Sequence, residues 1–382
     1  MVTSFASLVV GNCSPFDNRY VTYCVDNNRA CPETLDCLDS WLAWSYTELM
    51  NGKWVEHGPW SEALPSRSSK GGKLIAGGYR GILCVMRGDE KFVQKAFHMR
   101  VSWVSEQVCW MCCASRVRDS LNLYTYFGPG ATHRLSLISL SDFISDISKG
   151  CAWIRVPGFQ PEMLFYDFLH VFDLTMVPDA AATALVELSE DDSVWPGQSV
   201  DDRLRYAHVQ FVKLCREQKI RLSESVILAR WLMGITVAIA VKRPDDEHAQ
   251  LRAAVFINAV AIRQAVSLSH GPILPPHCIR KLQTANYLLH SAINWLAQGA
   301  IAAGHLRWKI RPKLHKLDHI CLDQAPLLSP LWTSTYGDED MVGKVKQFAM
   351  MAKPHLLGRQ VLLRYASYVC CRWLRQLEGQ KG

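Results

Sequence analysis

The residues best suited to chemistry lie near the end of the sequence, in the stretch 308–346. A basic Arg-Pro-Lys-x-His run at 311–315 precedes the acidic triplet Asp338-Glu339-Asp340, and Lys344 and Lys346 follow one turn later. Such a carboxylate cluster can bind a hard divalent cation, while the lysines can contact the phosphates of a phosphodiester. The same pattern is typical of an ordinary helix start, because acids in the first turn interact favourably with the helix dipole.

Two earlier acids each follow a predicted strand. Asp26 comes after the β-branched and aromatic run 19–25, and Asp89 comes directly after the apolar run 81–86 and Gly88. The C-terminal end of a strand is a usual position for a catalytic carboxylate in an α/β domain. For Asp26 the alternative, a turn or helix-cap residue, is favoured by the local sequence alone.

Cys109 and Cys112 form a Cys-x-x-Cys pair, which is typical of one half of a zinc site. Zinc takes four ligands, and no second Cys-x-x-Cys pair follows. Cys113, His133 and Cys151 are candidates to complete the set. The alternative is a pair of buried thiols without metal.

Asp167 and His170 stand three residues apart in a segment with a helical pattern. On a helix they share one face, so they can pair with each other or contact one ligand. The alternative is a histidine that packs against a neighbouring acid in the core.

Hydrophobic periodicity places helices at 34–50, 92–99, 136–149 and 180–188, and Gly52 is expected to end the first. The stretch 202–304 is almost entirely helical by pattern, with expected helices at 202–219, 222–242, 245–269 and 276–304. A basic, aromatic helical pair is expected at 340–378.

The composition of the chain indicates which broad classes of protein it can belong to. The chain has 382 residues, a formal net charge of +7 and 49% hydrophobic residues, so it can form a substantial core, and a nucleic-acid partner is permitted but not required. Its 14 cysteines lack the spacing of a small secreted framework, which favours reduced thiols and an intracellular location. The longest apolar run, 231–241, is too short to span a bilayer, so no membrane partner is expected.

Taken in order, these motifs resemble the CACTA and KDZ (Plavaka-like) superfamilies of cut-and-paste DNA transposases, whose relatives occur widely in protists, dinoflagellates among them. The resemblance rests on short motifs that extend over most of the chain. They are Gly88-Asp89, Asp167-Phe-Leu-His170, Pro312-Lys313-x-His315-x-x-x-His319 and Glu339-x-x-x-Gly343-x-x-Lys346. The Phe-Glu-Arg of those families is replaced here by Asp-Glu-Asp, so Asp338 or Asp340 is an alternative to Glu339.

The resemblance implies an RNase H-like α/β core interrupted by a large all-helical insertion. The expected parts are 1–155 for the first part of the core, 156–305 for the insertion and 306–382 for the final glutamate and basic helices. No N-terminal DNA-binding domain precedes Asp26, so the resemblance also implies a copy truncated at its N-terminus.

The implied function is cleavage and transfer of DNA strands in the nucleus by two Mg²⁺ or Mn²⁺ ions. The implied metal ligands are Asp26, Asp89 and Glu339, with Asp167 and His170 near the catalytic site. The implied nucleic-acid contacts are Lys313, His315, Lys344 and Lys346. Self-association is left open. The alternatives are a transposase-derived DNA-binding protein without catalysis, and a helical protein-interaction module with a small zinc site at Cys109 and Cys112.

Overall fold

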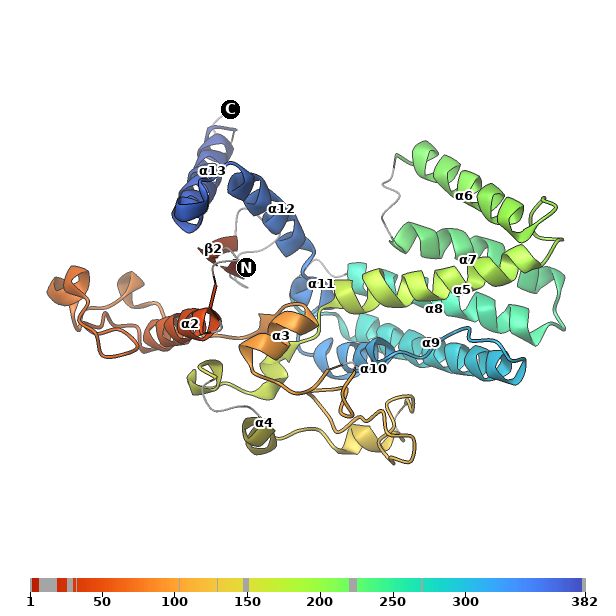
Figure 1. The fold of residues 1–382 in the computed structure, drawn as a ribbon, viewed down its shortest axis with the longest axis horizontal. Coiled ribbons are helices and arrows are strands. Elements are labelled where there is room, and N and C mark those ends of the chain that lie inside the picture. Colours follow the sequence, from red (N-terminus) through yellow and green to blue (C-terminus); the bar gives the residue numbers. More distant parts are fainter. Residues whose placement is uncertain are drawn as a thin grey trace. The chain divides into compact units, whose positions relative to one another are not determined.

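A computed structural model gives the fold of the chain (Figure 1). It describes residues 2–6, 19–25, 30–31, 33–102, 104–128, 130–146, 151–219, 225–268 and 271–379. The chain divides into two compact units. Unit 1 contains Met1–Arg100, Ser139–Leu164 and Ser334–Gly382, and unit 2 contains Val101–Ile138 and Phe165–Thr333. The three-part division expected from the sequence stays a prediction.

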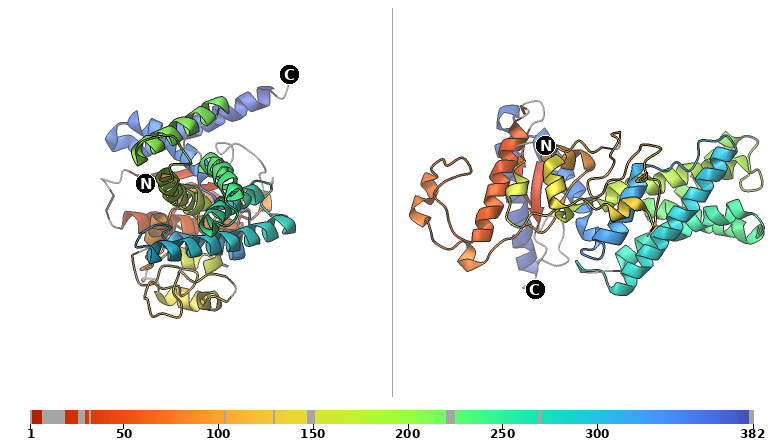
Figure 2. Two further views of the ribbon diagram at one scale, coloured as in Figure 1. Left: turned by 90° about the vertical axis from the view of Figure 1, so that its right-hand side faces the viewer. Right: turned by 90° about the horizontal axis from the view of Figure 1, so that it is seen from below.

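Unit 2 is built mainly from helices that lie side by side (Figures 1 and 2). Helix α8 (Glu247–Ser267) packs against both α7 (Ser225–Lys242) and α9 (Pro276–Ala302). Helices α5 (Val177–Glu190) and α6 (Val200–Glu217) pack against α7 and against each other. Burial of apolar side chains between these helices stabilises the unit, at about 25 cal/mol for each Å² removed from water.

The helix ends in unit 2 follow from local sequence. The Ser199 hydroxyl accepts a hydrogen bond from the Asp202 backbone N–H, and the Asp202 carboxylate accepts one from the Ser199 backbone N–H, which together form a capping box at the start of α6. Asp246 caps α8 by accepting from Ala249 N–H at 3.0 Å. The four helices predicted between 202 and 304 are confirmed, each to within three residues at its ends.

The chain enters and leaves this helical layer through shorter elements. The π-helical segment η7 (Leu169–Met176) runs directly into α5, and α10 (Pro312–His319) runs into a second π-helical segment, η8 (Ile320–Gln324). Helix α11 (Pro330–Thr333) follows. π-Helical turns are rare and are frequent at functional sites, and both η7 and η8 pack against α10.

Unit 1 contains a small antiparallel sheet and several helices. Strand β2 (Arg19–Cys24), which was predicted, pairs with β1 (Val2–Ala6). Helix α2 (Thr34–Asn51) confirms the helix expected at 34–50. It ends at Gly52, whose φ of 72° is a left-handed conformation that glycine adopts without strain.

The C-terminal helices complete the core of unit 1. Helices α12 (Tyr336–Met350) and α13 (Leu357–Gly379) confirm the predicted helical pair. They pack against each other, and α13 packs against β2. Their shared apolar cluster contains Cys24, Met341, Val345, Val361, Tyr365 and Val369. The remaining elements of the described chain are short. They are α3 (Glu90–Ala96), α4 (Leu140–Asp146), β3 (Met86–Arg87), β4 (Leu164–Phe165) and 3₁₀ turns at Pro65–Lys70, Ala76–Gly78, Thr132–Leu135, Trp153–Arg155, Pro161–Met163 and Pro354–Leu356.

The RNase H-like α/β core predicted from the resemblance is wrong. The described residues are mostly helical, and their strands form only the two-stranded sheets β1–β2 and β3–β4. The strand expected at 81–86 shrinks to β3, and Ile82 in that run is 64% exposed. An apolar run forms a strand only where a neighbouring strand accepts its backbone hydrogen bonds, and most of this run has no such neighbour among the described residues.

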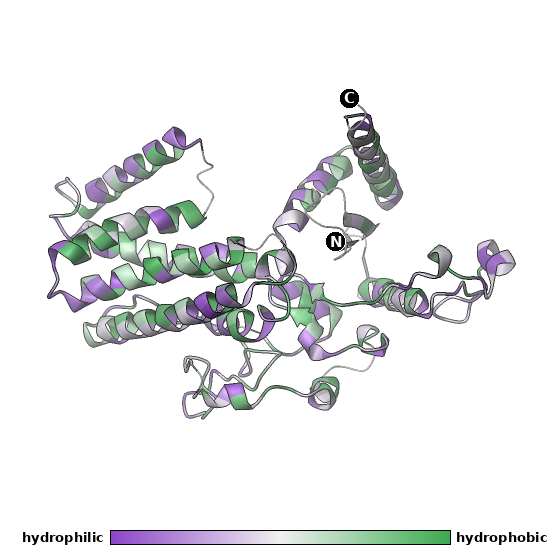
Figure 3. Ribbon diagram, turned by 180° about the vertical axis from the view of Figure 1, so that it is seen from behind, coloured by the Kyte–Doolittle hydropathy of each residue, from purple (hydrophilic) through white to green (hydrophobic). Residues whose placement is uncertain are grey.

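Two helical stretches, Leu169–Glu190 and Ser225–Lys242, are apolar and long enough to cross a membrane by length and composition alone. In the most apolar part of the first stretch 50% of residues are buried, against 28% in the second. Figure 3 shows that α7 is hydrophobic over most of its length, whereas α6 alternates between polar and apolar positions. Core helices of soluble proteins pass the same test, so the absence of a membrane partner stays a prediction.

Candidate metal centre

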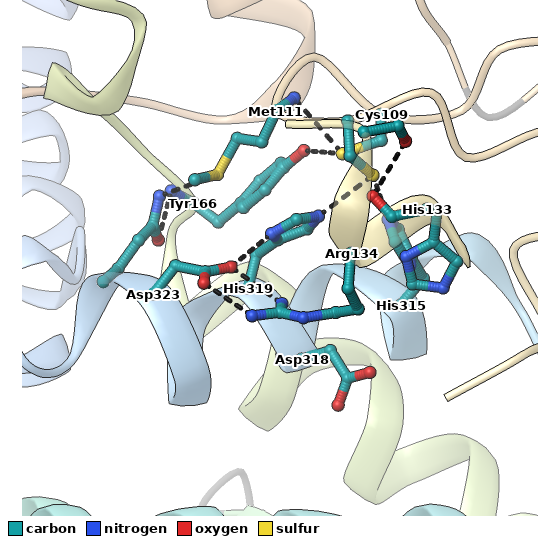
Figure 4. A network of polar contacts seen from close by, with 12 residues as sticks. Cys109, Met111, His133, Arg134, Tyr166, His315, Asp318, His319 and Asp323 are labelled. Carbon is teal, nitrogen blue, oxygen red and sulfur yellow. Dashed lines mark hydrogen bonds and ion pairs between the residues drawn. The ribbon is translucent and has the colours of Figure 1, made fainter. Parts of the chain in front are cut away.

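Four side chains with metal-binding atoms converge inside unit 2 (Figure 4). They are Cys109, Cys112, His315 and His319, and each is at most 2% exposed. The cysteines lie on a tight turn in the loop-rich stretch Val101–Ile138, which is fixed by backbone pairing of Gln107 with Ser115 and of Cys112 with Leu137. The histidines stand at i and i+4 on α10 and so project from one helix face.

The spacing of the ligand atoms suits a single tetrahedral ion. The four atoms all lie within 4.8 Å of one another. The Cys112 Sγ lies 3.4 Å from His315 Nε2 and 3.3 Å from His319 Nε2. Zinc bonds of about 2.3 Å to sulfur and about 2.0–2.1 Å to nitrogen at tetrahedral angles place such atoms roughly 3.5 Å apart. These two distances match that spacing, and the group as a whole could hold a metal such as zinc.

The Cys109 thiol is oriented by hydrogen bonds with its own turn and with Tyr166, the residue that follows β4 (Leu164–Phe165). The backbone N–H of Met111 donates to Cys109 Sγ at 3.3 Å, and Tyr166 Oη lies 3.1 Å from the same sulfur. Tyr166 is held in turn by Gln324, whose Oε1 accepts from the Tyr166 backbone N–H at 3.1 Å. Donors directed at sulfur stabilise a thiolate, which is the form that binds metal.

His319 is oriented by a carboxylate behind it. Its Nδ1 lies 2.6 Å from Asp323 Oδ2, and Arg134 fixes that carboxylate with two hydrogen bonds of 2.8 and 2.6 Å. Because an ionised carboxylate only accepts, Nδ1 carries a proton, and it is Nε2 that would give up its proton to a bound metal and present its lone pair to the centre. A carboxylate–histidine pair of this kind is a usual outer partner of a zinc ligand. The second histidine, His315, has no hydrogen-bond partner for Nδ1 among the described residues.

Aromatic rings close the site on the side of Cys109. The rings of Trp110 and Tyr166 lie in contact, with centroids 4.0 Å apart and planes tilted by 33°. The ammonium of Lys316, a residue only 1% exposed, lies 5.6 Å from the Trp110 ring and 5.8 Å from the Tyr166 ring. Cation–π attraction of this kind stabilises a buried ammonium.

The electrostatics of the four side chains are strongly coupled. Burial alone would raise the pKa of Cys109, but hydrogen bonding with Cys112 and the charge of His319 outweigh it, so the pKa lies well below its ordinary value. The hydrogen bond with Cys109, together with burial, raises the pKa of Cys112. Burial lowers the pKa of His315 to about 4. Burial also opposes protonation of His319, yet the Cys109 thiolate and Asp323 raise the pKa of His319 to about 9.

The structure completes the predicted Cys-x-x-Cys half-site, but not with the residues that the sequence suggested. Cys113 is exposed, and Cys151 belongs to unit 1, where its thiol donates to the Ala96 carbonyl oxygen. His133 packs edge-on against His315 with ring centroids 4.5 Å apart, but its Nε2 is engaged by the Tyr126 carbonyl oxygen. The interpretation of Cys113, His133 and Cys151 as the completing ligands is therefore wrong.

Asp167 and His170 form the pair that their spacing predicted, through Asp167 Oδ2 and His170 Nδ1. The pair lies at the start of η7. There Lys313 Nζ donates to the His170 carbonyl oxygen at 3.1 Å and to Thr175 Oγ1 at 2.8 Å. The prediction that Lys313 contacts nucleic acid stays untested, but its ammonium is already used to fix η7 against α10.

The expected DNA contact by His315 is wrong, because that side chain is 2% exposed and directed at the thiols. Lys344 lies over the rings of Phe348 and Tyr368 at 5.4 and 4.9 Å, while Lys346 is exposed. Contacts of these two lysines with nucleic acid stay predictions.

The three acids proposed to bind magnesium are not brought together among the described residues. Asp26 lies outside them. Asp89 caps α3, where its Oδ1 accepts from the Phe92 N–H at 2.6 Å, and Glu339 is exposed in the first turn of α12. Neither belongs to a group of three potential metal ligands in the described part of the chain. Asp338 instead pairs with Arg87 at 3.0 Å, so this acidic triplet is a helix start anchored to β3.

Comparison with known proteins adds no relative. No family model matches the chain, and neither a curated protein nor a solved structure is detectably similar to it. Arguments about its function therefore rest on the geometry of its own residues.

Sequence reasoning missed His315 and His319 as metal ligands and Asp323 and Arg134 as their supports. The His-x-x-x-His spacing on a predicted helix was itself a signal, since it places two imidazoles on one face. It had been attributed to the transposase-like motif. The supporting pair of Asp323 and Arg134 carries no sequence signal, because its members are 189 positions apart.

Proposed function

We propose that the chain binds one Zn²⁺ ion at Cys109, Cys112, His315 and His319 and that the ion is structural. The observation that carries this proposal is a closed set of four buried ligand atoms within 4.8 Å of one another. A catalytic zinc site keeps one position open for water or substrate, whereas a structural site is filled by four protein ligands.

The stretch that supplies the cysteines needs such a cross-link. Between Val101 and Ile138 the described residues form isolated bridges, turns and one short 3₁₀ helix. Loops without a regular hydrogen-bond ladder contribute little stability of their own, and a metal ion that joins them to a helix stabilises the folded state by its binding free energy. Zinc would tie this loop-rich stretch to α10.

The function supported best is that of a helical binding module whose fold depends on zinc. The buried centre gives no access to a substrate, so it serves architecture rather than reaction. Metal-dependent DNA cleavage, which the transposase-like motifs imply, stays a prediction. Nicking of supercoiled plasmid in Mg²⁺ or Mn²⁺, compared with an Asp89→Ala/Glu339→Ala double variant, tests it.

The test of the zinc proposal uses adjacent cysteines as a matched pair. The chain is purified in reducing buffer, its zinc content is measured by elemental analysis, and its thermal unfolding is followed with and without a strong chelator. We expect one zinc per chain in the wild type and in Cys113→Ser, and none in Cys112→Ser. Chelation should lower the Tm of the first two proteins and leave that of Cys112→Ser unchanged. A folded wild-type chain without zinc whose Tm is unaffected by added zinc or chelator would refute the proposal.

A further inference from the structure

A second candidate site is a pocket of about 200 Å³ in unit 2, beside α10. One wall is formed by the end of η7 and the first turns of α5, and the other by the segment from Leu306 to Leu314 that leads into α10. At roughly 30 Å³ for each water of liquid volume, the pocket has room for a small ligand only. The zinc ligands do not line it, although Lys313 and Leu314 of α10 do.

The charged lining of the pocket is predominantly basic. Lys309, Arg311 and Lys313 line it together with one acid, Asp179, which leaves a formal charge of +2. Lys313 is fixed by its bonds to the His170 carbonyl oxygen and Thr175 Oγ1. Lys309 has no such fixed partner, since no hydrogen bond or ion pair joins it to another described residue. The pocket therefore contains one ammonium that is fixed in place, on Lys313, and one whose charge is not neutralised, on Lys309.

Arg311 is held in a way that leaves its outer nitrogens available. Its Nε pairs with Asp179 Oδ2 at 3.1 Å, and its two Nη atoms make no hydrogen bond or ion pair with the described residues. A guanidinium pinned through Nε can still donate two parallel hydrogen bonds through the Nη atoms, which is the geometry that carboxylate and phosphate accept.

The rest of the lining is apolar. Met176, Ile293, Leu306 and Trp308 contribute to it, and the Trp308 indole is oriented by a 2.7 Å hydrogen bond from Nε1 to Glu187 Oε1. Leu306 is 83% exposed, which would leave an apolar side chain in water unless a ligand covers it. A ligand that fits both parts carries an anionic group and a small apolar group.

From this arrangement we propose that the pocket binds a phosphate monoester carried on a small apolar or aromatic group. A monoester carries a charge of about −1.5 to −2 at neutral pH, which matches the formal charge of the lining. The phosphate would lie between Lys309 and the Nη atoms of Arg311, with the apolar group on Leu306 and Met176. This site goes beyond the structural role proposed for zinc and does not rest on it.

The experiment uses the purified full chain and phenyl phosphate as the probe, with affinity measured by calorimetry. Inorganic phosphate and benzyl alcohol serve as probes that lack the ring or the charge. We expect saturable binding of phenyl phosphate, weaker binding of inorganic phosphate and none of benzyl alcohol. Lys309→Gln should weaken the binding of phenyl phosphate roughly tenfold, or about 1.4 kcal/mol. Ala182→Phe, a change at an exposed position that lines the pocket, should abolish binding by filling it.

The control is Lys281→Gln, which removes the same charge from an exposed lysine of α9 that does not line the pocket. Its affinity for phenyl phosphate should equal that of the wild type. Equal losses in Lys309→Gln and Lys281→Gln would show nonspecific attraction and overturn the proposal, as would equal binding of benzyl alcohol. Absence of phenyl phosphate binding at millimolar concentration by the wild type would also overturn it. Zinc content and Tm, measured on every variant, separate a failure of this site from a failure of the zinc proposal.

Discussion

Nδ1 of His319 lies 2.6 Å from Oδ2 of Asp323, and this contact determines which ring nitrogen faces the two cysteines. Asp323 is four residues further along the chain, within the π-helical segment that follows α10, and Arg134 from the cysteine-bearing stretch fixes its carboxylate. The residues that hold the ligand therefore come from the same two segments as the ligands themselves.

Asp323→Asn should weaken zinc binding without removing it. The amide cannot accept as strongly from Nδ1–H, so the ring loses orientation and basicity, and losses of roughly 10- to 100-fold in metal affinity are usual for such partners. Competition with a chromophoric chelator measures the affinity. Asp191→Asn, which breaks a surface ion pair with Arg243 elsewhere in unit 2, is the control and should keep wild-type affinity. An unchanged affinity in Asp323→Asn would show that this carboxylate plays no part at the metal.

Asp39 in α2 should make the stability of unit 1 depend on pH. It is 3% exposed, and no hydrogen bond reaches its carboxylate oxygens within the described part of the chain. Burial raises the pKa of Asp39 from 3.8 to about 7, although the nearby Trp153 opposes that shift. The native state thus binds this proton more tightly than the unfolded chain does. The contribution of Asp39 to the free energy of unfolding is therefore most favourable below pH 3.8. It declines between pH 3.8 and about 7 and stays low above that range.

The corresponding variant is Asp39→Asn. At pH 8 it should be more stable than the wild type by on the order of 4 kcal/mol, because no charge then has to be buried. Urea unfolding of unit 1 at pH 5 and at pH 8, followed by a probe in that unit, gives the two free energies. Glu33→Gln, at the exposed start of the same helix, should leave the pH dependence intact. A wild-type protein whose stability changes with pH no differently from that of Asp39→Asn would contradict the prediction.

The packing of α8 against α9 predicts that two neighbouring leucines of α9 differ in their contribution to stability. Leu289 is fully buried, whereas Leu288 on the same helix is 45% exposed. Leu289→Ala should lower the free energy of unfolding by about 2–5 kcal/mol through lost burial and a residual cavity. Leu288→Ala should change it by roughly 0.5 kcal/mol or less. Chemical unfolding measures both, and equal effects would show that α9 is packed differently.

Periodicity was a sound guide to the helices of this chain, whereas only one of its two predicted strands, at 19–25, formed at close to the expected length. Helix α6 alternates between polar and apolar positions, and α7 is hydrophobic over most of its length. Ser199, Asp246 and the proline at 276 mark the starts of α6, α8 and α9, so local sequence decides these helices. The run at 81–86 carries apolar residues without a pairing partner, and nothing local distinguishes that from a strand. Asp89 likewise has the same sequence signature whether it caps a helix or binds a metal.

Only half of the candidate metal site could be predicted from the sequence. The spacing of Cys109 and Cys112 predicts half of a zinc site. Identifying the other two ligands requires knowing which distant helix packs on that turn. That pairing is set by the tertiary packing of α10, which no local pattern encodes. Cys113 and His133 were nearer in sequence and were therefore favoured.

The distance along the chain between the two ligand pairs has a consequence for synthesis. Cys112 and His315 are separated by 203 positions. At roughly 5–20 residues per second, a ribosome exposes the cysteines about 10–40 s before the histidines. During that interval the nascent chain offers two thiols and no imidazole from α10, so an ion captured early would be held by an incomplete and exchangeable site. Stable zinc binding is therefore expected only after the α10 histidines have emerged from the ribosome, long after the cysteines.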